Sequence, residues 1–140
     1  MMNVVVIGAA GSVGSSVLAV CEAWPEKIHI VGLAANRRSQ KLQALAEKFG
    51  VSRVCAFEES GESGLEELVL MPEAEHVVFA SSGTGAIKAL CSALKAGKTV
   101  SLANKESIVV GGPWVMPLVK APEQLRPVDS EHNAIWQCLH

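Results

Sequence analysis

The sequence lacks several features that define whole classes of protein. It contains no uninterrupted apolar run near the ~20 residues that a membrane-spanning helix requires. It has no excess of basic residues, because its formal net charge is −2, and this argues against a nucleic-acid binder. It has no C-x-x-C pair, so neither a zinc site nor a dithiol redox site is indicated. The 140 residues therefore predict one globular domain that binds neither nucleic acid nor a membrane.

The cysteines and the first residues predict a cytoplasmic location. Cys21, Cys55, Cys91 and Cys138 are far apart in the sequence, and we expect all of them to be reduced, buried thiols. The chain begins with MMNVVVIGAAG, which has no basic segment and leads directly into a predicted strand. We therefore expect neither a signal peptide nor a transit peptide.

Strand-like and helix-like segments alternate along the chain. Short apolar runs predict strands at 3–8, 28–34, 53–57, 76–81 and 98–103, with a weaker one at 124–128. Helical patterns lie at 12–24, 39–50 and 84–97. Because the strands are almost continuously apolar, they are typical of parallel strands covered on both faces. The pattern predicts an α/β, Rossmann-like, doubly wound fold with a mainly parallel sheet and helices on both faces.

Two finer expectations concern the helices. In the first helix we expect one buried face, formed by Val13, Val17, Val20 and Cys21. We expect the acidic stretch at 58–69 to be a solvated loop that leads into a short helix.

The first strand ends in a glycine-rich turn, GAAGSVG, in which Gly8, Gly11 and Gly14 follow a G-x-x-G-x-x-G spacing. Gly8 permits a tight turn, Gly11 lets the backbone approach a pyrophosphate, and Gly14 allows close packing of the helix. Ala10 stands where the common dinucleotide fingerprint has its second glycine. Because the turn lies between a strand and a helix, it predicts a nucleotide site, the alternative being a glycine-rich packing turn.

The segment after the second strand, LAANRRSQ, indicates which nucleotide is bound. An NAD site usually has an acidic residue here, whereas this segment has Asn36, Arg37 and Arg38 and no carboxylate. Asn36 can bond a ribose, and the two guanidinium groups suit a 2′-phosphate. We therefore predict NADPH; the alternative is that the arginines only solvate a helix start.

Polar groups also follow the later strands. After the strand at 98–103, Asn104, Lys105 and Glu106 should look into the cofactor crevice, where Lys105 suits a substrate oxygen or phosphate, unless it is simply an exposed lysine. After the last strand, Asp129 and Glu131 flank Ser130. They either cap a helix or supply oxygen ligands for Mg²⁺ or Mn²⁺. The capping alternative predicts a buried stripe formed by Ala134, Ile135, Cys138 and Leu139.

Four motifs in this order, GAAGSVG, AANRR, LANKES and PVDSEHNAIWQ, resemble the 1-deoxy-D-xylulose 5-phosphate reductoisomerase family. The resemblance spans essentially the whole chain, but only the N-terminal, NADPH-binding part of such an enzyme. It implies isomerisation and reduction of 1-deoxy-D-xylulose 5-phosphate to 2-C-methyl-D-erythritol 4-phosphate in non-mevalonate isoprenoid biosynthesis. It also implies dependence on NADPH and Mg²⁺ or Mn²⁺, and a homodimer for the full-length protein.

The resemblance assigns roles to individual residues. It implies that Ala10, Gly11, Ser12 and Val13 contact the pyrophosphate of the cofactor. It also implies that Asn36, Arg37 and Arg38 hold the adenosine end, and that Asn104 and Glu106 contact the other half of the cofactor. Substrate contacts are implied for Lys105, Ser130 and Glu131, and metal ligands are Asp129 and Glu131. Lys105 and Glu131 are the implied catalytic residues. Ala10 departs from the threonine expected in the family, which puts one cofactor contact in doubt.

The resemblance also predicts how the chain is divided. Residues 1–128 would be the NADPH-binding Rossmann domain, and 129–140 would begin a catalytic region that is cut inside a helical pattern. Since the family's further metal ligand and phosphate-binding cluster lie beyond this point, we expect no activity from the chain alone. Two alternatives remain open: another NADP-dependent dehydrogenase, of the aspartate-semialdehyde or homoserine type, or a non-catalytic NADP(H)-sensing module.

Overall fold

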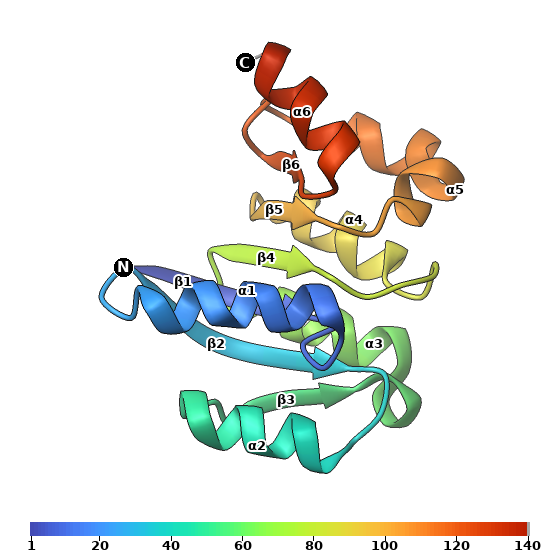
Figure 1. Ribbon diagram of the computed structural model, residues 1–140. Helices are drawn as coiled ribbons and strands as arrows, with labels where there is room; N and C mark the ends of the chain where they lie inside the picture. Colours follow the sequence, from blue (N-terminus) through green and yellow to red (C-terminus); the bar gives the residue numbers. More distant parts are fainter. Residues whose placement is uncertain (140) are drawn as a thin grey trace.

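The computed structural model describes residues 1–139, and the side chains of Ser130 and Glu131 lie outside this description. One six-stranded parallel sheet organises the fold, with the order β3-β2-β1-β4-β5-β6 (Figure 1). The strands are β1 (Met2–Ile7), β2 (Ile28–Ala35), β3 (Arg53–Ala56), β4 (His76–Phe79), β5 (Thr99–Leu102) and β6 (Leu125–Pro127). The direction of winding reverses between β1 and β4, so the predicted doubly wound sheet is confirmed.

Helices cover the sheet between successive strands. They are α1 (Ser12–Ala23), α2 (Gln40–Phe49), α3 (Phe57–Val69), α4 (Ile87–Lys95), α5 (Glu106–Val115) and α6 (Ser130–Leu139), with a 3₁₀ turn η1 (Met116–Leu118) after α5. Figure 1 shows α1 and α2 in front of the sheet and α3 and α4 behind it. The predicted helices on both faces are therefore confirmed.

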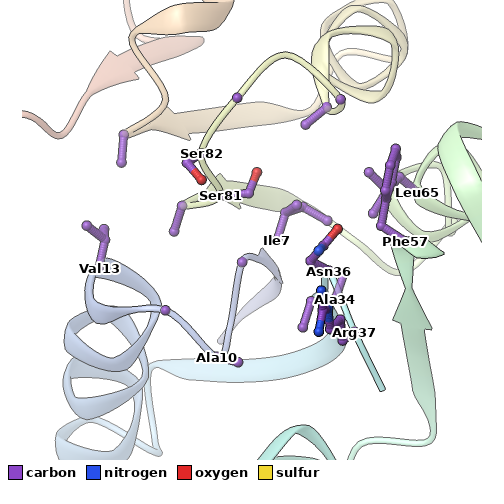
Figure 2. Close-up of a pocket in the computed structure, with 18 of the residues that line it drawn as sticks. Ile7, Ala10, Val13, Ala34, Asn36, Arg37, Phe57, Leu65, Ser81 and Ser82 are labelled. Atoms are coloured by element: carbon purple, nitrogen blue, oxygen red, sulfur yellow. The ribbon is translucent and has the colours of Figure 1, made fainter. Parts of the chain in front are cut away.

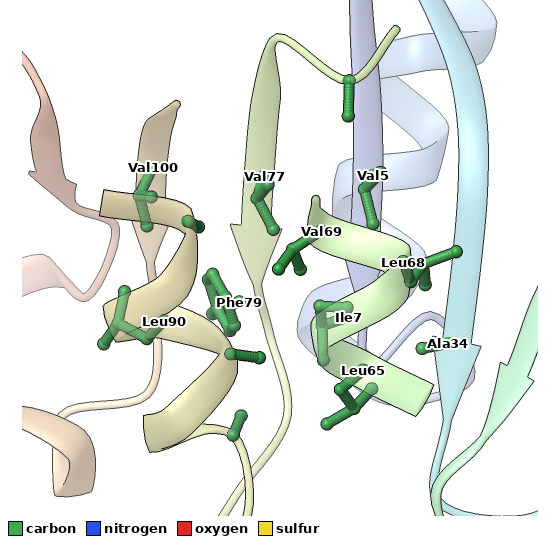
Figure 3. Packing of buried hydrophobic residues seen from close by; sticks show 14 of the residues in the cluster. Val5, Ile7, Ala34, Leu65, Leu68, Val69, Val77, Phe79, Leu90 and Val100 are labelled. Carbon is green, nitrogen blue, oxygen red and sulfur yellow. The ribbon is translucent and has the colours of Figure 1, made fainter. Parts of the chain in front are cut away.

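Alternating strand residues supply two buried clusters, one on each face. Val5, Val77 and Phe79 belong to the cluster packed against α3 and α4 (Figure 3). Val4 and Val6 belong to the other cluster, which includes buried residues of α1 and α2. Because strand side chains alternate between faces, both sets must be apolar, and this explains the continuous apolar runs in the sequence.

The buried face of α1 differs from the prediction. The helix buries Gly14, Leu18 and Cys21, whereas Val20 is 52% exposed and Val13 is also exposed. The reason is Gly14, because a Cβ at this position would lie 2.1 Å from the carbonyl oxygen of Gly8. The helix packs on the glycine turn through Gly14, which leaves Val13 and Val20 on the solvent side, while Val17 is half-buried against the core.

Helix α3 also differs from the prediction, because it begins at Phe57 rather than after a loop. Gly61, at φ 62° and ψ −157°, separates a first turn from the rest of the helix. Glu58 and Glu59 lie in that first turn, where carboxylates are favourable to the helix dipole. The backbone N–H of Glu58 donates to the Asn36 carbonyl oxygen at 2.9 Å and fastens the turn to the end of β2.

The C-terminal helix does not bury the expected stripe. In α6, Ala134, Ile135 and Cys138 are exposed and Leu139 is 74% exposed. The prediction of four buried cysteines was correct for Cys21 and Cys55 and wrong for Cys138, which is exposed; Cys91 is half-buried. Within residues 1–139, no helix has both the length and the apolar character needed to cross a membrane.

Candidate functional site

A cavity of about 770 Å³ lies at the carboxyl ends of the central strands, where the winding reverses (Figure 2). Its walls come from the glycine turn, the end of β2, the loop after β4 and the start of α3. In Figure 2, Val13 and Phe57 stand at opposite sides of the cavity. Many of the predicted cofactor residues line it: Gly8, Ala10, Gly11, Ser12, Val13, Asn36, Arg37 and Glu106.

The glycine turn has the geometry that its spacing predicts. Gly8 has φ 84°, and a Cβ there would lie 2.5 Å from the backbone nitrogen of Ser81. Any other residue at Gly8 would therefore meet the chain that leaves β4. Gly11 is different, because the nearest atom to an added Cβ is 3.6 Å away. The protein itself does not require glycine at this position, so the space in front of Gly11 is open for a ligand.

The amino end of α1 faces the cavity with its N–H groups uncapped. Gly11 is the N-cap residue and, among the described residues, no side chain accepts a capping hydrogen bond from the first N–H groups; the first turn also contains no acidic residue. The first N–H groups of a helix have no partner inside the helix and give this end a partial positive charge. The Lys41 ammonium donates to the Ala10 carbonyl oxygen at 2.8 Å and adds a cation beside the turn. The arrangement suits a pyrophosphate.

The adenosine end of the predicted site contains carboxylates that the local sequence does not show. Arg37 lines the cavity, and its Nε lies 3.8 Å from Glu58 Oε2. Arg38 is not among the lining residues; its Nη2 lies 3.0 Å from Glu59 Oε2. The hydrogen bond from Arg38 to Glu59 raises the pKa of the guanidinium group. The segment LAANRRSQ itself contains no carboxylate, but α3 brings Glu58 and Glu59 beside it.

Sequence reasoning missed the loop after β4 and an apolar wall. The loop residues Ser81, Ser82, Gly83, Thr84 and Gly85 all line the cavity. Phe57 and Leu65 form an apolar side of the cavity (Figure 2), and the Phe57 ring packs on Gly85. The useful signal was the polar, glycine-containing run ASSGTG after an apolar strand. Its importance depended on β4 being the neighbour of β1.

Asn104 has a different position from its neighbours in the LANKES motif. The residue is 2% exposed, and its side-chain amide nitrogen donates to the Gly83 carbonyl oxygen at 2.6 Å. Its amide oxygen accepts the backbone N–H of Ser107 at 3.0 Å. Asn104 thus links the loop after β4 to the start of α5 through hydrogen bonds. Of its two neighbours in the motif, Glu106 lines the large cavity and Lys105 does not.

A second cavity, of about 290 Å³, lies between β6, α5 and α6. Lys105, Asp129 and His132 line it together with mainly apolar residues. The structure therefore brings Lys105 and Asp129 to one place, as expected for residues at the same sheet edge. The predicted contacts through the side chains of Ser130 and Glu131 lie outside the described residues.

Asp129 caps α6 in this structure. Its Oδ2 accepts the backbone N–H of His132 at 3.1 Å and also hydrogen-bonds Nδ1 of the His132 ring. Burial acts to raise the pKa of Asp129, but the His132 hydrogen bonds outweigh it, so the pKa lies below the usual value. No three His, Cys, Asp or Glu side chains gather as a metal site among the described residues.

Comparisons with known proteins agree with this geometry. A model of the 1-deoxy-D-xylulose 5-phosphate reductoisomerase family matches residues 4–61 and 57–112. The reductoisomerase of Psychrobacter sp. (strain PRwf-1) is 37% identical to this chain, over 98% of the chain and 38% of the relative. A crystal structure of DOX-P reductoisomerase in complex with NADPH, fosmidomycin and magnesium has a TM-score of 0.88 at 32% identity, covering 99% of this chain and 39% of that one.

More distant proteins share the fold alone. A homoserine dehydrogenase from Thiobacillus denitrificans has a TM-score of 0.66 at 24% identity, covering 90% of this chain and 28% of that one. The chain spans about 40% of the length of the reductoisomerases that it matches. The family model covers most of the chain, and the chain belongs to the 1-deoxy-D-xylulose 5-phosphate reductoisomerase family.

Proposed function

We propose that this chain is the NADPH-binding part of an enzyme that isomerises and reduces 1-deoxy-D-xylulose 5-phosphate to 2-C-methyl-D-erythritol 4-phosphate, in non-mevalonate isoprenoid biosynthesis. The observation that supports this most is the large cavity at the reversal of winding, which faces an uncapped helix amino end. A related reductoisomerase has been crystallised with NADPH. Because the chain spans about 40% of its relatives, the complete reaction is proposed for a protein of their length.

We propose that the pyrophosphate of NADPH binds at the glycine turn. Gly11 leaves the space open, and the backbone N–H groups of Ser12 and Val13 lie at the positive end of α1. The side chain of Ala10 offers no hydrogen bond, so binding at this position depends on the backbone. At the adenosine end, Asn36, Arg37 and the apolar Phe57 line the same side of the cavity (Figure 2), which suits a base and a phosphorylated ribose.

We propose that the substrate binds next to the second cavity, which Lys105 and Asp129 both line. When bound, NADPH supplies the hydride, and Mg²⁺ or Mn²⁺ supplies Lewis-acid polarisation of substrate oxygens. The Lys105 ammonium would orient the sugar phosphate and stabilise developing negative charge on oxygen. Asp129 and Glu131 would be metal ligands, and Ser130 and Glu131 substrate contacts. Since the described residues do not complete a ligand set, we expect this chain alone to be inactive.

The remaining features of the proposal follow from the same assignment. Residues 1–128 form the cofactor domain, and 129–140 begin the catalytic region. Glu106 lines the cofactor cavity, and Asn104 borders it through its bond to Gly83. We place the protein in the cytoplasm, since its cysteines are free thiols. A homodimer is proposed for the full-length protein on its family resemblance.

The variant Gly11→Asp tests the cofactor site directly. A Cβ added at Gly11 would have no protein atom nearer than 3.6 Å, so the fold should tolerate the substitution, while the carboxylate would repel the pyrophosphate. We expect NADPH affinity to fall at least about 10-fold, corresponding to roughly 1.4 kcal/mol. Isothermal titration calorimetry measures this change. The matched control is Gly112→Asp in α5, where an added Cβ meets nothing within 4 Å. Equal NADPH affinities of Gly11→Asp and the unmodified chain would contradict the proposed site.

A further inference from the structure

The two arginines at the adenosine end are each paired with a glutamate from α3. The Nε of Arg38 lies 3.1 and 3.0 Å from the two carboxylate oxygens of Glu59, and its Nη2 lies 3.0 Å from one of them. Arg37 and Glu58 are farther apart, at 3.8 Å. Two guanidinium groups therefore face two carboxylates, and this part of the rim has no net charge.

The first turn of α3 holds these carboxylates in place. The Glu58 N–H bonds the carbonyl oxygen of Asn36, which is the residue before Arg37. Phe57, at the start of the same turn, lines the cofactor cavity and packs on Gly85. The turn is thus fixed on both sides, so the position of Glu59 beside Arg38 follows from the fold of the chain.

The pairing affects the two nicotinamide cofactors differently. A 2′-phosphate would be attracted by Arg37, which lines the cavity, but it would have to compete with Glu59 for Arg38. NADH has no 2′-phosphate, so its binding does not depend on this competition. Building on the proposed NADPH site, we propose that Glu59 is a specificity-determining residue. By holding Arg38 in an ion pair, Glu59 limits the preference of the site for NADPH over NADH.

In this proposal, Glu59 limits the preference for NADPH more strongly than Glu58 does. The Glu59 pair has three close contacts, whereas the Glu58 pair has one long contact. Arg37 remains the main phosphate contact in the unmodified chain, and Arg38 becomes available only when Glu59 loses its charge. The effects of Glu59 and Arg38 on NADPH binding should therefore be coupled.

Titrations of NADPH and NADH at low ionic strength test the inference with Glu59→Gln, Arg38→Ala and the double variant. Glu59→Gln should tighten NADPH binding by about two- to five-fold, the range for an exposed ion pair, and leave NADH binding unchanged. Arg38→Ala alone should have little effect, and the double variant should lose the gain of Glu59→Gln. Glu62→Gln is the matched control, since it removes a carboxylate from the exposed surface of the same helix.

The titrations can overturn the inference in several ways. Weaker NADPH binding by Glu59→Gln would overturn the inference, because it would show that Glu59 positions Arg38 for the phosphate. An equal change in NADH binding, or a gain that persists in the double variant, would also overturn it. Failure of the unmodified chain to bind either nucleotide would contradict the proposed cofactor function, and this inference with it. Urea unfolding of each variant separates these results from a loss of folded protein.

Discussion

Gly8, Gly11 and Gly14 occur in one motif, yet the structure requires glycine at only two of them. Gly8 and Gly14 lie against protein backbone, where a Cβ would be 2.5 and 2.1 Å from the nearest atom. Gly11 has open space before it, which is the position where a ligand rather than the protein would exclude a side chain. Within the motif, Gly8 and Gly14 are therefore needed for the shape of the turn, and Gly11 leaves space for a cofactor.

His76 is a second residue whose role depends on its neighbours. Its Nδ1 and Nε2 lie 2.6 and 2.8 Å from the hydroxyl oxygens of Thr99 and Ser101. Burial, and then the charge of Arg126, lower the pKa of His76 from 6.5 to about 4. Between these two pH values the unfolded chain binds more protons than the folded chain, so acid favours unfolding.

The contribution of His76 to stability should therefore be complete above pH 6.5 and decline as the pH falls toward 4. The full loss is about 3 kcal/mol in the free energy of unfolding. Urea unfolding between pH 7 and 4 measures the decline, which should become shallower in His76→Gln. His29→Gln, which changes an exposed histidine, is the control. An unchanged pH dependence in His76→Gln would contradict this account.

Among the elements, those with local signals were predicted well from the sequence. Helix α2 lies within its predicted range because Ser39 accepts the Leu42 N–H at its start and Gly50 adopts φ 65° at its end. Helix α3 and the face of α1 were predicted poorly, because both depend on contacts between distant segments. The carboxylates beside Arg37 and Arg38 were missed for the same reason. They come from α3, and no pattern within LAANRRSQ indicates that α3 packs beside this segment.

The break in α3 gives a prediction for this element. Gly61 has a backbone conformation that is almost restricted to glycine, while an added Cβ would meet nothing within 4 Å. Gly61→Ala should therefore lower the free energy of unfolding by roughly 1–3 kcal/mol through backbone strain alone. Gly112→Ala is the matched control, because its Cβ is equally free and its φ is not positive. If urea unfolding gave the same free energy of unfolding for Gly61→Ala and the unmodified chain, the prediction of backbone strain at this position would be contradicted.

In the molecule as a whole, the parallel sheet gathers the ends of β1, β2 and β4 around one cavity. The sequence motifs identified the glycine turn and the end of β2 as walls of this cavity, because each of these motifs follows a predicted strand, but they missed the loop after β4 and the apolar side. They could not show which groups share a cavity, and the structure places Lys105 and Asp129 in the second cavity rather than the first. The proposed substrate side is therefore separate from the cofactor cavity within this chain.

Comparison of NADPH and NADH binding by the unmodified chain tests the central claim most directly. Arg37 at the cavity should give a charge-assisted contact with the 2′-phosphate, worth roughly 1.5–3 kcal/mol, which corresponds to about 10- to 150-fold in affinity. Because Glu59 competes for Arg38, we expect a preference near the lower end of this range. Isothermal titration calorimetry should therefore show NADPH binding about 10-fold more tightly than NADH, with the difference lost in Arg37→Ala/Arg38→Ala. Equal affinities of the unmodified chain for the two cofactors would contradict the account.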